Sequence, residues 1–420
     1  MSVSEWREVR IGDIGDVVTG KTPSSKNPEY FGDEIPFVTP TDYKNYHKNI
    51  YSSERYLSQA GKEVLGNKLL PINSVIVTCI GSDMGKVAIN KVECITNQQI
   101  NSIILKRDLA DSDFIYYTLI SMQEYLKMLA RGGTTMPIVN KSTFEEIKLL
   151  LPPFPEQKAI AATLSVLDDM IELNNQINKT LEEMAQAIFK SWFVDFEPFK
   201  NGEFEESELG LIPKGWRVGK LDDVLSEIET GNRPKGGVAG VESGIPSIGA
   251  ENVLGLGKYD YSKEKYVSEE FYNSMKKGKL KDWDVLLYKD GAQLGRKTMF
   301  ALGFPHKKCC VNSHVFILRS NSRMNQCYLY FWLDQDYMTQ KIIGLNANSA
   351  QPGINQPAVK GLPILIPPID VLERFDDLVV PIIKNLFSNC LENNILVSIR
   401  DTLLPKLMSG EIRVPVDEVM

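Results

Sequence analysis

Residues 151–160 read LPPFPEQKAI, and residues 366–375 read IPPIDVLERF. In each stretch, two prolines follow an apolar run that is typical of a strand, and a long segment with helical spacing follows the prolines. The two stretches begin 215 residues apart in a chain of 420 residues. Because the same pattern of an apolar run, two prolines and a helical segment recurs half a chain later, we expect the chain to be a tandem repeat.

An alignment of the two halves extends the repeat over most of the chain. The offset between matching residues stays between 210 and 215, as expected if only loops gain or lose residues. The matches are Trp6-Arg7 with Trp216-Arg217, Thr19-Gly20 with Thr230-Gly231, Ile35-Pro36 with Ile245-Pro246, YSSERYLS (51–58) with YSKEKYVS (261–268), VIVTCIGSDMG (75–85) with VLLYKDGAQLG (285–295), and Pro137–Asn140 with Pro352–Asn355. Each repeat therefore consists of a block of roughly 150 residues and a helical segment.

The blocks mix the signals of strands and helices. Val75–Ile80 is rich in β-branched residues, and a Gly81…Gly85 turn and the segment KVAIN follow it, which predicts a hairpin. Asp113–Leu129 has the apolar spacing of a helix. We therefore predict an α+β fold with two pseudo-repeated globular blocks and two long helices.

The helical segments have the heptad pattern of a coiled coil. Residues 156–197 contain no Gly and no Pro, and the seam positions hold Ile160, Leu164, Leu167, Ile171, Asn174, Asn178, Leu181, Ala185, Ile188 and Trp192. The second seam holds Phe375, Val379, Ile382, Leu386, Asn389, Asn393, Leu396, Arg400, Leu403 and Leu407. A buried seam asparagine fixes the register of a coiled coil at some loss of stability. The alternative is two amphipathic core helices with solvated asparagines.

Two prolines interrupt the second helical segment. We expect Pro381 to kink that helix or to mark its start, and Pro405 to end it, because proline lacks the backbone N–H of a helix interior.

Composition excludes several classes of protein. No apolar run approaches the ~18 residues of a membrane helix, and the start, MSVSEWREVR, lacks the apolar core of a signal peptide. The six cysteines have no CxxC spacing and the three histidines are scattered, so we expect buried reduced thiols, a cytoplasmic protein and no metal site.

The net charge of −7 is unevenly distributed. The acidic excess lies in the helical segments and in the linker 201–213, so the two blocks are mildly basic. That distribution permits a DNA-binding face on each block.

Three stretches of this sequence resemble the specificity subunit of type I restriction–modification systems: LPPFPEQKAIAATLSVLDDMIELNNQ (151–176), AQAIFKSWFVDFEPF (185–199) and RDTLLPKLMSGEI (400–412). The repeat architecture extends the resemblance over essentially the whole chain. It implies two target recognition domains, each reading one half of a split DNA sequence, separated by two long antiparallel coiled-coil helices. The second helix departs from the pattern, because IDVLERF replaces the Glu-Gln pair after the prolines and Pro381 lies within the segment.

The resemblance also implies a domain organisation and a set of partners. We expect recognition domain 1 at 1–153, a central long helix region at 154–200, a linker and recognition domain 2 at 201–368, a C-terminal long helix region at 369–409 and a tail at 410–420. The expected partners are double-stranded DNA, two modification subunits and restriction subunits, with no membrane. S-adenosylmethionine, ATP and Mg would lie on the partner subunits, and this chain would bind no cofactor.

No catalytic motif is complete in the chain. LPPF at 151–154 is similar to the [N/D]PP[Y/F] motif of amino-methyltransferases, but aliphatic Leu151 cannot bind the target amino group. The loops GSDMG and GAQLG lack phosphate-loop spacing, and no GxxxxGK[ST] occurs. We therefore expect a non-catalytic subunit. The alternatives are a self-contained DNA methyltransferase and a coiled-coil scaffold that binds no DNA.

Base reading requires side chains with paired donors and acceptors on exposed loops. The candidates in the first block are Lys21, Thr22, Ser82, Asp83, Lys86, Asn97, Gln98, Gln99, Arg131, Thr134 and Thr135. Those in the second block are Asn232, Arg233, Lys235, Lys289, Asp290, Gln293, Arg296, Asn312 and His314. The run Asn97-Gln98-Gln99 is the strongest candidate, because amide side chains can bind adenine bidentately.

Overall fold

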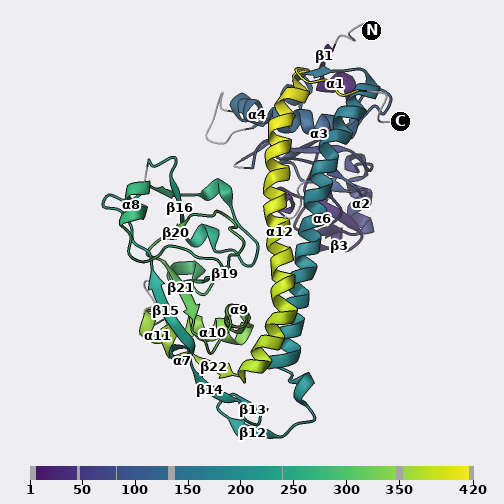
Figure 1. The fold of residues 1–420 in the computed structure, drawn as a ribbon. Helices are drawn as coiled ribbons and strands as arrows, with labels where there is room; N and C mark the ends of the chain where they lie inside the picture. Colours follow the sequence, from purple (N-terminus) through teal and green to yellow (C-terminus); the bar gives the residue numbers. More distant parts are fainter. Residues whose placement is uncertain are drawn as a thin grey trace. The chain divides into compact units, whose positions relative to one another are not determined.

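The computed structural model describes residues 6–44, 48–81, 83–130, 138–238, 240–346 and 353–415. The chain divides into two compact units, Met1–Glu172 with Ile395–Met420, and Leu173–Asn394. Each unit contains one block of the repeat and part of each long helix (Figure 1). Within the described ranges, no helix combines the length and the apolar character that a membrane span needs.

The first unit contains two main sheets. The larger has the strand order β2 (Gly15–Thr19), β10 (Ile100–Leu105), β7 (Val75–Thr78), β8 (Val87–Asn90) and β5 (Asn49–Ile50). The smaller has the order β3 (Phe31–Gly32), β6 (Tyr56–Leu57), β4 (Ile35–Val38) and β9 (Ile95–Thr96), and β1 (Arg7–Arg10) pairs with β11 (Lys148–Leu151). Neighbouring strands are antiparallel except in the pairs β4–β9 and β5–β8. The antiparallel pairing of β7 with β8 confirms the predicted hairpin.

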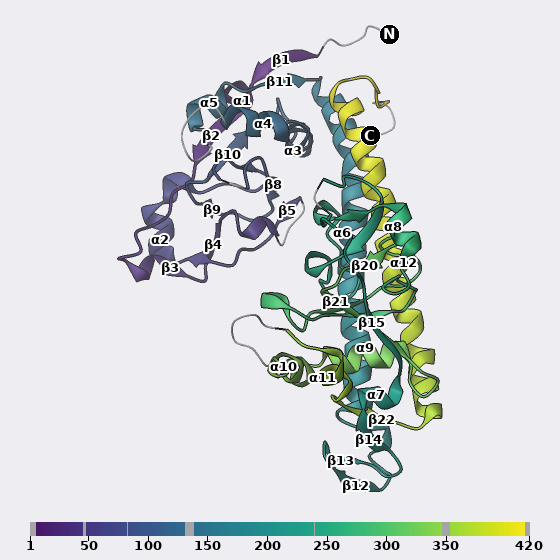
Figure 2. The same cartoon turned by 90° about the vertical axis from the view of Figure 1, so that its left-hand side faces the viewer.

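Short helices complete the first unit. They are α1 (Ile11–Ile14), α2 (Gln59–Val64), α3 (Ser112–Ser121), α4 (Gln123–Ala130), α5 (Lys141–Glu145) and the 3-10 helices η1 (Pro28–Tyr30), η2 (Asp42–Lys44) and η3 (Gly66–Lys68). In Figure 2, α3, α4 and α5 gather near β1 and β11, while α2 lies beside β3 at the opposite end. The predicted helix over 113–129 is broken at Met122, and no Gly or Pro marks that break in the sequence.

The second unit repeats this order of elements. Its sheets are β15 (Leu225–Thr230), β21 (Val315–Ser320), β18 (Val285–Tyr288) and β19 (Lys297–Met299), then β17 (Tyr266–Val267), β16 (Ile245–Ile248) and β20 (Cys310–Val311), then β14 (Arg217–Lys220) with β22 (Pro363–Ile366), and the linker hairpin β12 (Phe204–Ser207) with β13 (Gly210–Pro213). Its short helices are α7 (Leu221–Val224), α8 (Glu269–Ser274), α9 (Gln326–Asp334), α10 (Asp336–Gly344), α11 (Gln356–Lys360), η4 (Glu197–Phe199), η5 (Ala250–Asn252), η6 (Tyr261–Lys263) and η7 (Gly291–Gln293). The α+β fold and its internal repeat are therefore confirmed.

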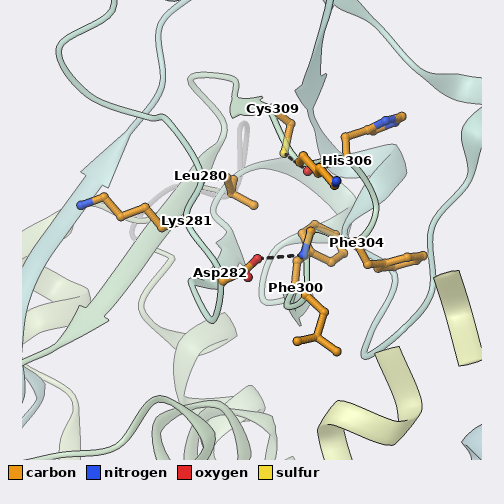
Figure 3. A pocket seen from close by; sticks show the side chains of 10 residues that line it. Leu280, Lys281, Asp282, Phe300, Phe304, His306 and Cys309 are labelled. Carbon is orange, nitrogen blue, oxygen red and sulfur yellow. Dashed lines mark hydrogen bonds between the residues drawn. The ribbon is translucent and has the colours of Figure 1, made fainter. Parts of the chain in front are cut away.

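The structure also locates the change in offset between the repeats. β8 and β19 begin 210 residues apart, whereas β9 and β20 begin 215 apart, so the second unit gains its extra residues in Phe300–Cys309. This segment and Leu280–Asp282 line a cavity of about 590 Å³ (Figure 3). The Gly303 N–H donates to Asp282 Oδ1 at 3.0 Å, which ties the inserted loop to the cavity wall.

The two long helices are α6 (Phe154–Phe193) and α12 (Ile369–Met408). In the first unit Asp168 pairs with Arg400, and in the second Asn174 pairs with Asn393 and Asn178 with Asn389. Because one residue number rises as the other falls between the two asparagine pairs, α6 and α12 are antiparallel in the second unit. All twenty predicted seam positions are buried or half-buried, as the heptad assignment requires.

Pro381 does not mark the start of α12 and Pro405 does not end it, so these two predictions were wrong. The helix begins at Ile369, twelve residues before Pro381, and continues for three residues beyond Pro405. Both prolines are exposed, and so are Asp377 and Asp401, four residues before them. Since the carbonyls that lose a helical partner lie on the solvent side, water can satisfy them and the helix continues.

Buried side chains join each block to its helices. In the second unit, Phe193 of α6 packs against Tyr328 of α9 and Phe375 of α12, with ring centroids 4.7 Å and 5.0 Å apart.

All six cysteines are buried free thiols, as expected. Burial raises the pKa of Cys79 and Cys94 to about 12, so both stay protonated at neutral pH.

Candidate nucleic-acid interface

One end of the main sheet of the first unit gathers most of the described candidates. The chain leaves β2 at Lys21, whose N–H donates to Thr96 O at 2.9 Å. The chain leaves β7 at Cys79, whose N–H donates to Gln99 O at 2.7 Å. These bonds place the loop after β2, the β7–β8 turn and the segment before β10 side by side, although they are far apart in sequence.

Close backbone contact at this end requires glycine. A Cβ on Gly20 would lie 2.2 Å from Thr96 O, and a Cβ on Gly231 would lie 1.5 Å from Val311 O. Any other residue would force the loop away from the strand it crosses. The repeat alignment had matched these two glycines without revealing their role, because the close approach joins segments about 76 and 80 residues apart.

The run at 97–99 separates into inward-facing and outward-facing side chains. Asn97 is only 7% exposed, and its Nδ2 donates to Gln99 Oε1 at 2.9 Å. Gln98 is exposed, and its Oε1 accepts a hydrogen bond of 2.6 Å from Thr22 Oγ1. Asn97 therefore shapes the loop, whereas Gln98 and the half-buried Gln99 remain accessible.

The turn of the β7–β8 hairpin contributes charge to the same end. Lys86 Nζ lies 2.6 Å from Asp83 Oδ1, and both side chains are about one-third exposed. Such a half-exposed pair adds little stability, so Lys86 can exchange this partner for a phosphate. The candidates Ser82, Arg131, Thr134 and Thr135 lie outside the described residues.

The second unit forms the same frame with other side chains. The Lys289 N–H donates to His314 O at 3.0 Å, and the Asn312 N–H donates to Ile248 O at 3.0 Å. His314 Nδ1 lies 2.6 Å from Asp290 Oδ2, which joins the β18–β19 turn to the segment before β21. Lys289, Asp290, Asn312 and His314 therefore lie together.

The remaining candidates of the second unit lie in two loops. Asn232, Arg233 and Lys235 are exposed in the segment after β15 that crosses Val311 at Gly231. Gln293 and Arg296 lie in the β18–β19 turn, where the Tyr288 N–H donates to Arg296 O at 2.8 Å. Arg296 is exposed and Gln293 is half-buried.

Besides Asp290, the carboxylate of Glu251 interacts with basic residues of this region. Burial of Glu251 opposes its ionisation, but hydrogen bonding from Lys265 and the charge of Arg233 outweigh burial and lower the pKa of Glu251. Glu251 is therefore ionised at neutral pH, and it offsets part of the positive charge of this loop.

Equivalent positions of the two units show what is shared. Asn312 stands where the first unit has Asn97, and Arg296 stands where it has Lys86. Other positions on the same surface differ, because His314 replaces Gln99 and Asp290 replaces Ile80. A shared frame with different exposed side chains suits two readers of different sequences.

The seam asparagines join the two helices in the second unit. Asn174 Nδ2 donates to Asn393 Oδ1 at 3.0 Å and to Glu392 Oε2 at 3.0 Å. Asn389 Nδ2 donates to Asn178 Oδ1 at 2.9 Å. These bonds satisfy amides that would otherwise be costly inside the seam, and each is formed in one register only.

A polar network, which sequence reasoning missed, anchors the first block to both helices. Tyr117 Oη donates to Asp168 Oδ2 at 2.6 Å, and Arg400 donates to Asp168 Oδ1 at 2.8 Å. Burial, together with the charge of Asp168, raises the pKa of Tyr117 far above its ordinary value, so the phenol remains a donor. Lys48 is 6% exposed and bonds Asp113 on α3 and Ser165 on α6.

The family described as the type I restriction modification DNA specificity domain matches residues 3–183 and 213–400 of this chain. The chain belongs to this family. The type I restriction enzyme MjaIX specificity subunit of Methanocaldococcus jannaschii is 33% identical to it, over 98% of this chain and 94% of that protein. The HindI specificity subunit of Haemophilus influenzae is 23% identical, over 98% of this chain and 100% of that protein.

A solved structure shows the same fold. The crystal structure of a type I restriction–modification S subunit from M. genitalium superposes with a TM-score of 0.59 at 18% identity, covering 96% of each chain. The present chain is therefore a specificity subunit with two target recognition domains and two long helices.

In this specificity subunit the LPPF segment is a junction between strand and helix. Leu151 ends β11 and is 1% exposed, and α6 begins at Phe154. Gln157 fixes the junction, because its Nε2 donates to Pro152 O at 2.9 Å and its Oε1 accepts from Asp111 N at 3.0 Å. In the second helix Leu372 occupies the equivalent position, and Asn325 Nδ2 donates to Leu372 O instead.

Proposed function

We propose that each target recognition domain reads one half of a bipartite double-stranded DNA sequence through the loops at one end of its main sheet. The observation that carries this proposal is the pair of equivalent loop sets, which share a backbone frame and differ in their exposed side chains. Loops with amide, imidazole and guanidinium groups can reach base edges in the major groove. The shared basic residue, Lys86 or Arg296, would contact phosphate.

The same proposal assigns the spacer to the helices. α6 has 40 residues, so at ~1.5 Å per residue it is about 60 Å long. Successive major-groove faces on one side of a duplex lie ~34 Å apart, so two readers carried by such helices could reach successive grooves. The seam asparagines would prevent the helices from sliding.

We propose further that two modification subunits dock on the outer faces of these helices. Exposed apolar side chains remain there in both units, although helix surfaces in water are usually polar. In the first unit they include Val166, Met170, Ile395 and Ile399, and in the second they include Leu173, Ile177, Met184 and Leu378. Restriction subunits would join the same assembly, and the complex would act on DNA in the cytoplasm.

Catalysis is assigned to the partners. This chain would bind no cofactor, while S-adenosylmethionine would be used by the modification subunits and ATP with Mg by the restriction subunits. The burial of Leu151 where an amino-methyltransferase needs a polar side chain supports this assignment. If the purified chain alone bound S-adenosylmethionine and methylated DNA, the alternative of a self-contained methyltransferase would replace it.

A domain exchange tests independent reading. Residues 1–150 are replaced by the equivalent block of another family member, and methylated sites are mapped after co-expression with the modification subunits. We expect one half-site to change and the other to persist. A change in both halves would contradict independent reading, and the absence of sequence-specific DNA binding by the assembled complex would favour a scaffold.

A further inference from the structure

The first recognition domain holds the oxygen atoms of two neighbouring glutamine side chains in internal hydrogen bonds. Thr22 Oγ1 donates to Gln98 Oε1 at 2.6 Å. Asn97 Nδ2 donates to Gln99 Oε1 at 2.9 Å, and Asn97 Oδ1 accepts from the Gln99 backbone N–H at 3.0 Å. In the described part of the chain, no group accepts a hydrogen bond from either Nε2 atom.

The orientation of the Gln99 amide is fixed, because Asn97 Oδ1 already accepts from a backbone N–H and Asn97 must therefore present its NH2 group, and the structure likewise places the Gln98 oxygen against the Thr22 hydroxyl. A glutamine side chain can present its oxygen or its NH2 group to a base, and rotation exchanges the two. When the oxygen is already held, the NH2 group is the part left to face a ligand. Gln98 is exposed, so its NH2 group can reach DNA without a change in the loop.

We propose that Thr22 and Asn97 are positioning residues that make Gln98 and Gln99 hydrogen-bond donors toward a purine of the first half-site. The acceptor would be N7, which adenine and guanine both present in the major groove. This inference rests on the proposed function, and it revises the expectation that these glutamines bind adenine bidentately.

In the second recognition domain a hydrogen bond also orients a candidate base-reading side chain, but the residues are a histidine and an aspartate. His314 stands at the position of Gln99, and Asp290 Oδ2 lies 2.6 Å from its Nδ1. Because a carboxylate accepts, Nδ1 carries the proton and Nε2 is the atom left for a base. At the equivalent of Thr22 the second domain has Arg233, so the two domains orient their readers through different partners.

The test measures binding of the chain assembled with its modification subunits to duplexes in which single purines of the first half-site are replaced by 7-deazapurines. We expect at least one replacement to weaken binding about tenfold, the factor for one hydrogen bond of ordinary strength. In Gln98→Ala that sensitivity should disappear. Thr22→Val should lose most of it, and Thr22→Ser should regain it.

Controls separate positioning from damage. Thr143→Val removes an exposed hydroxyl from α5 in the same unit, and it should keep the full sensitivity. Unfolding midpoints of the threonine variants show whether each is folded, and the serine variant tests the hydroxyl alone.

Two results would overturn the inference: a wild-type complex indifferent to every 7-deaza replacement, or full sensitivity in Thr22→Val. If the complex binds its target specifically in either case, only the donor assignment fails. If it shows no preference for any target sequence, the proposed function itself fails.

Discussion

Two carboxylates share one guanidinium in the first unit, which provides a matched experiment. Arg400 donates to Asp168 Oδ1 at 2.8 Å and to Asp401 Oδ1 at 2.8 Å. The side chain of Asp168 is 7% exposed, whereas that of Asp401 is 57% exposed. Asp168→Asn and Asp401→Asn are therefore the same chemical change on the same partner, and they differ in burial and in the hydrogen bond that only Asp168 accepts from Tyr117.

The structure predicts unequal losses of stability. Asp168 also accepts a hydrogen bond from the buried Tyr117, so its replacement weakens two contacts at once. Breaking a buried ion pair lowers the free energy of unfolding by ~3–5 kcal/mol. We expect the lower end, about 3 kcal/mol, because Arg400 is 27% exposed and retains its ion pair with Asp401. An exposed pair is worth below ~1 kcal/mol, and salt screens it.

Thermal unfolding of the purified chain measures the difference. For a unit of this size, ~1 kcal/mol corresponds to about 2–4 °C in the melting temperature. Asp168→Asn should therefore melt about 6–12 °C below the wild type, and Asp401→Asn less than about 4 °C below it at moderate salt. Equal shifts in the two variants would refute the argument that burial gives this network its energy.

Four further changes test other parts of the structure. Inserting four residues near Thr180 should lengthen the spacer by nearly two base pairs, since one helical turn adds ~6 Å and a base pair ~3.4 Å. Inserting two residues should turn the seam outward and abolish assembly. If the mapped methylation sites kept their spacer after the four-residue insertion, the helices would not set the distance between half-sites. Lys86→Ala should weaken binding to all DNA sequences and reduce the salt slope by about one, whereas a loss confined to one half-site would assign Lys86 to a base. Asp376→Asn should raise the melting temperature at pH 7 but not at pH 4. Burial raises the pKa of Asp376 to about 6, so the folded chain loses stability as the pH rises from about 4 to about 6 and the buried carboxyl ionises. A pH series of thermal melts checks this, with Asp377→Asn at an exposed position as the control. Gly231→Ala should abolish recognition of the second half-site only, because its Cβ would lie 1.5 Å from Val311 O. Gly344→Ala should leave DNA binding unchanged, because the space around its Cβ is open. A DNA-binding assay on both variants checks this.

The patterns that could be predicted from sequence are local or periodic. The hairpin β7–β8 follows from a β-branched run and two glycines close together in the chain. The two long helices and their asparagine positions follow from a heptad repeated over forty residues, whereas their antiparallel orientation was expected only from the family resemblance. The repeat itself follows from comparing the chain with its own second half, which needs no knowledge of contacts.

Local rules failed where the surroundings decide the energy. Pro381 and Pro405 do not bound α12, because both lie on its exposed side, where water can satisfy the carbonyls that lose a helical partner. The sequence could not show which side of the helix each proline would face.

The sequence by itself determined the family, the two recognition domains and the seam of the long helices, because these depend on residue order and spacing. Only the tertiary structure decided that Gly20 and Gly231 lie against neighbouring strands, that Asn97 faces inward and that Thr22 holds Gln98. Thr22 and Gln98 are 76 residues apart in the chain. A hydrogen bond needs its two atoms within about 3 Å, and only the folded backbone brings such distant residues that close.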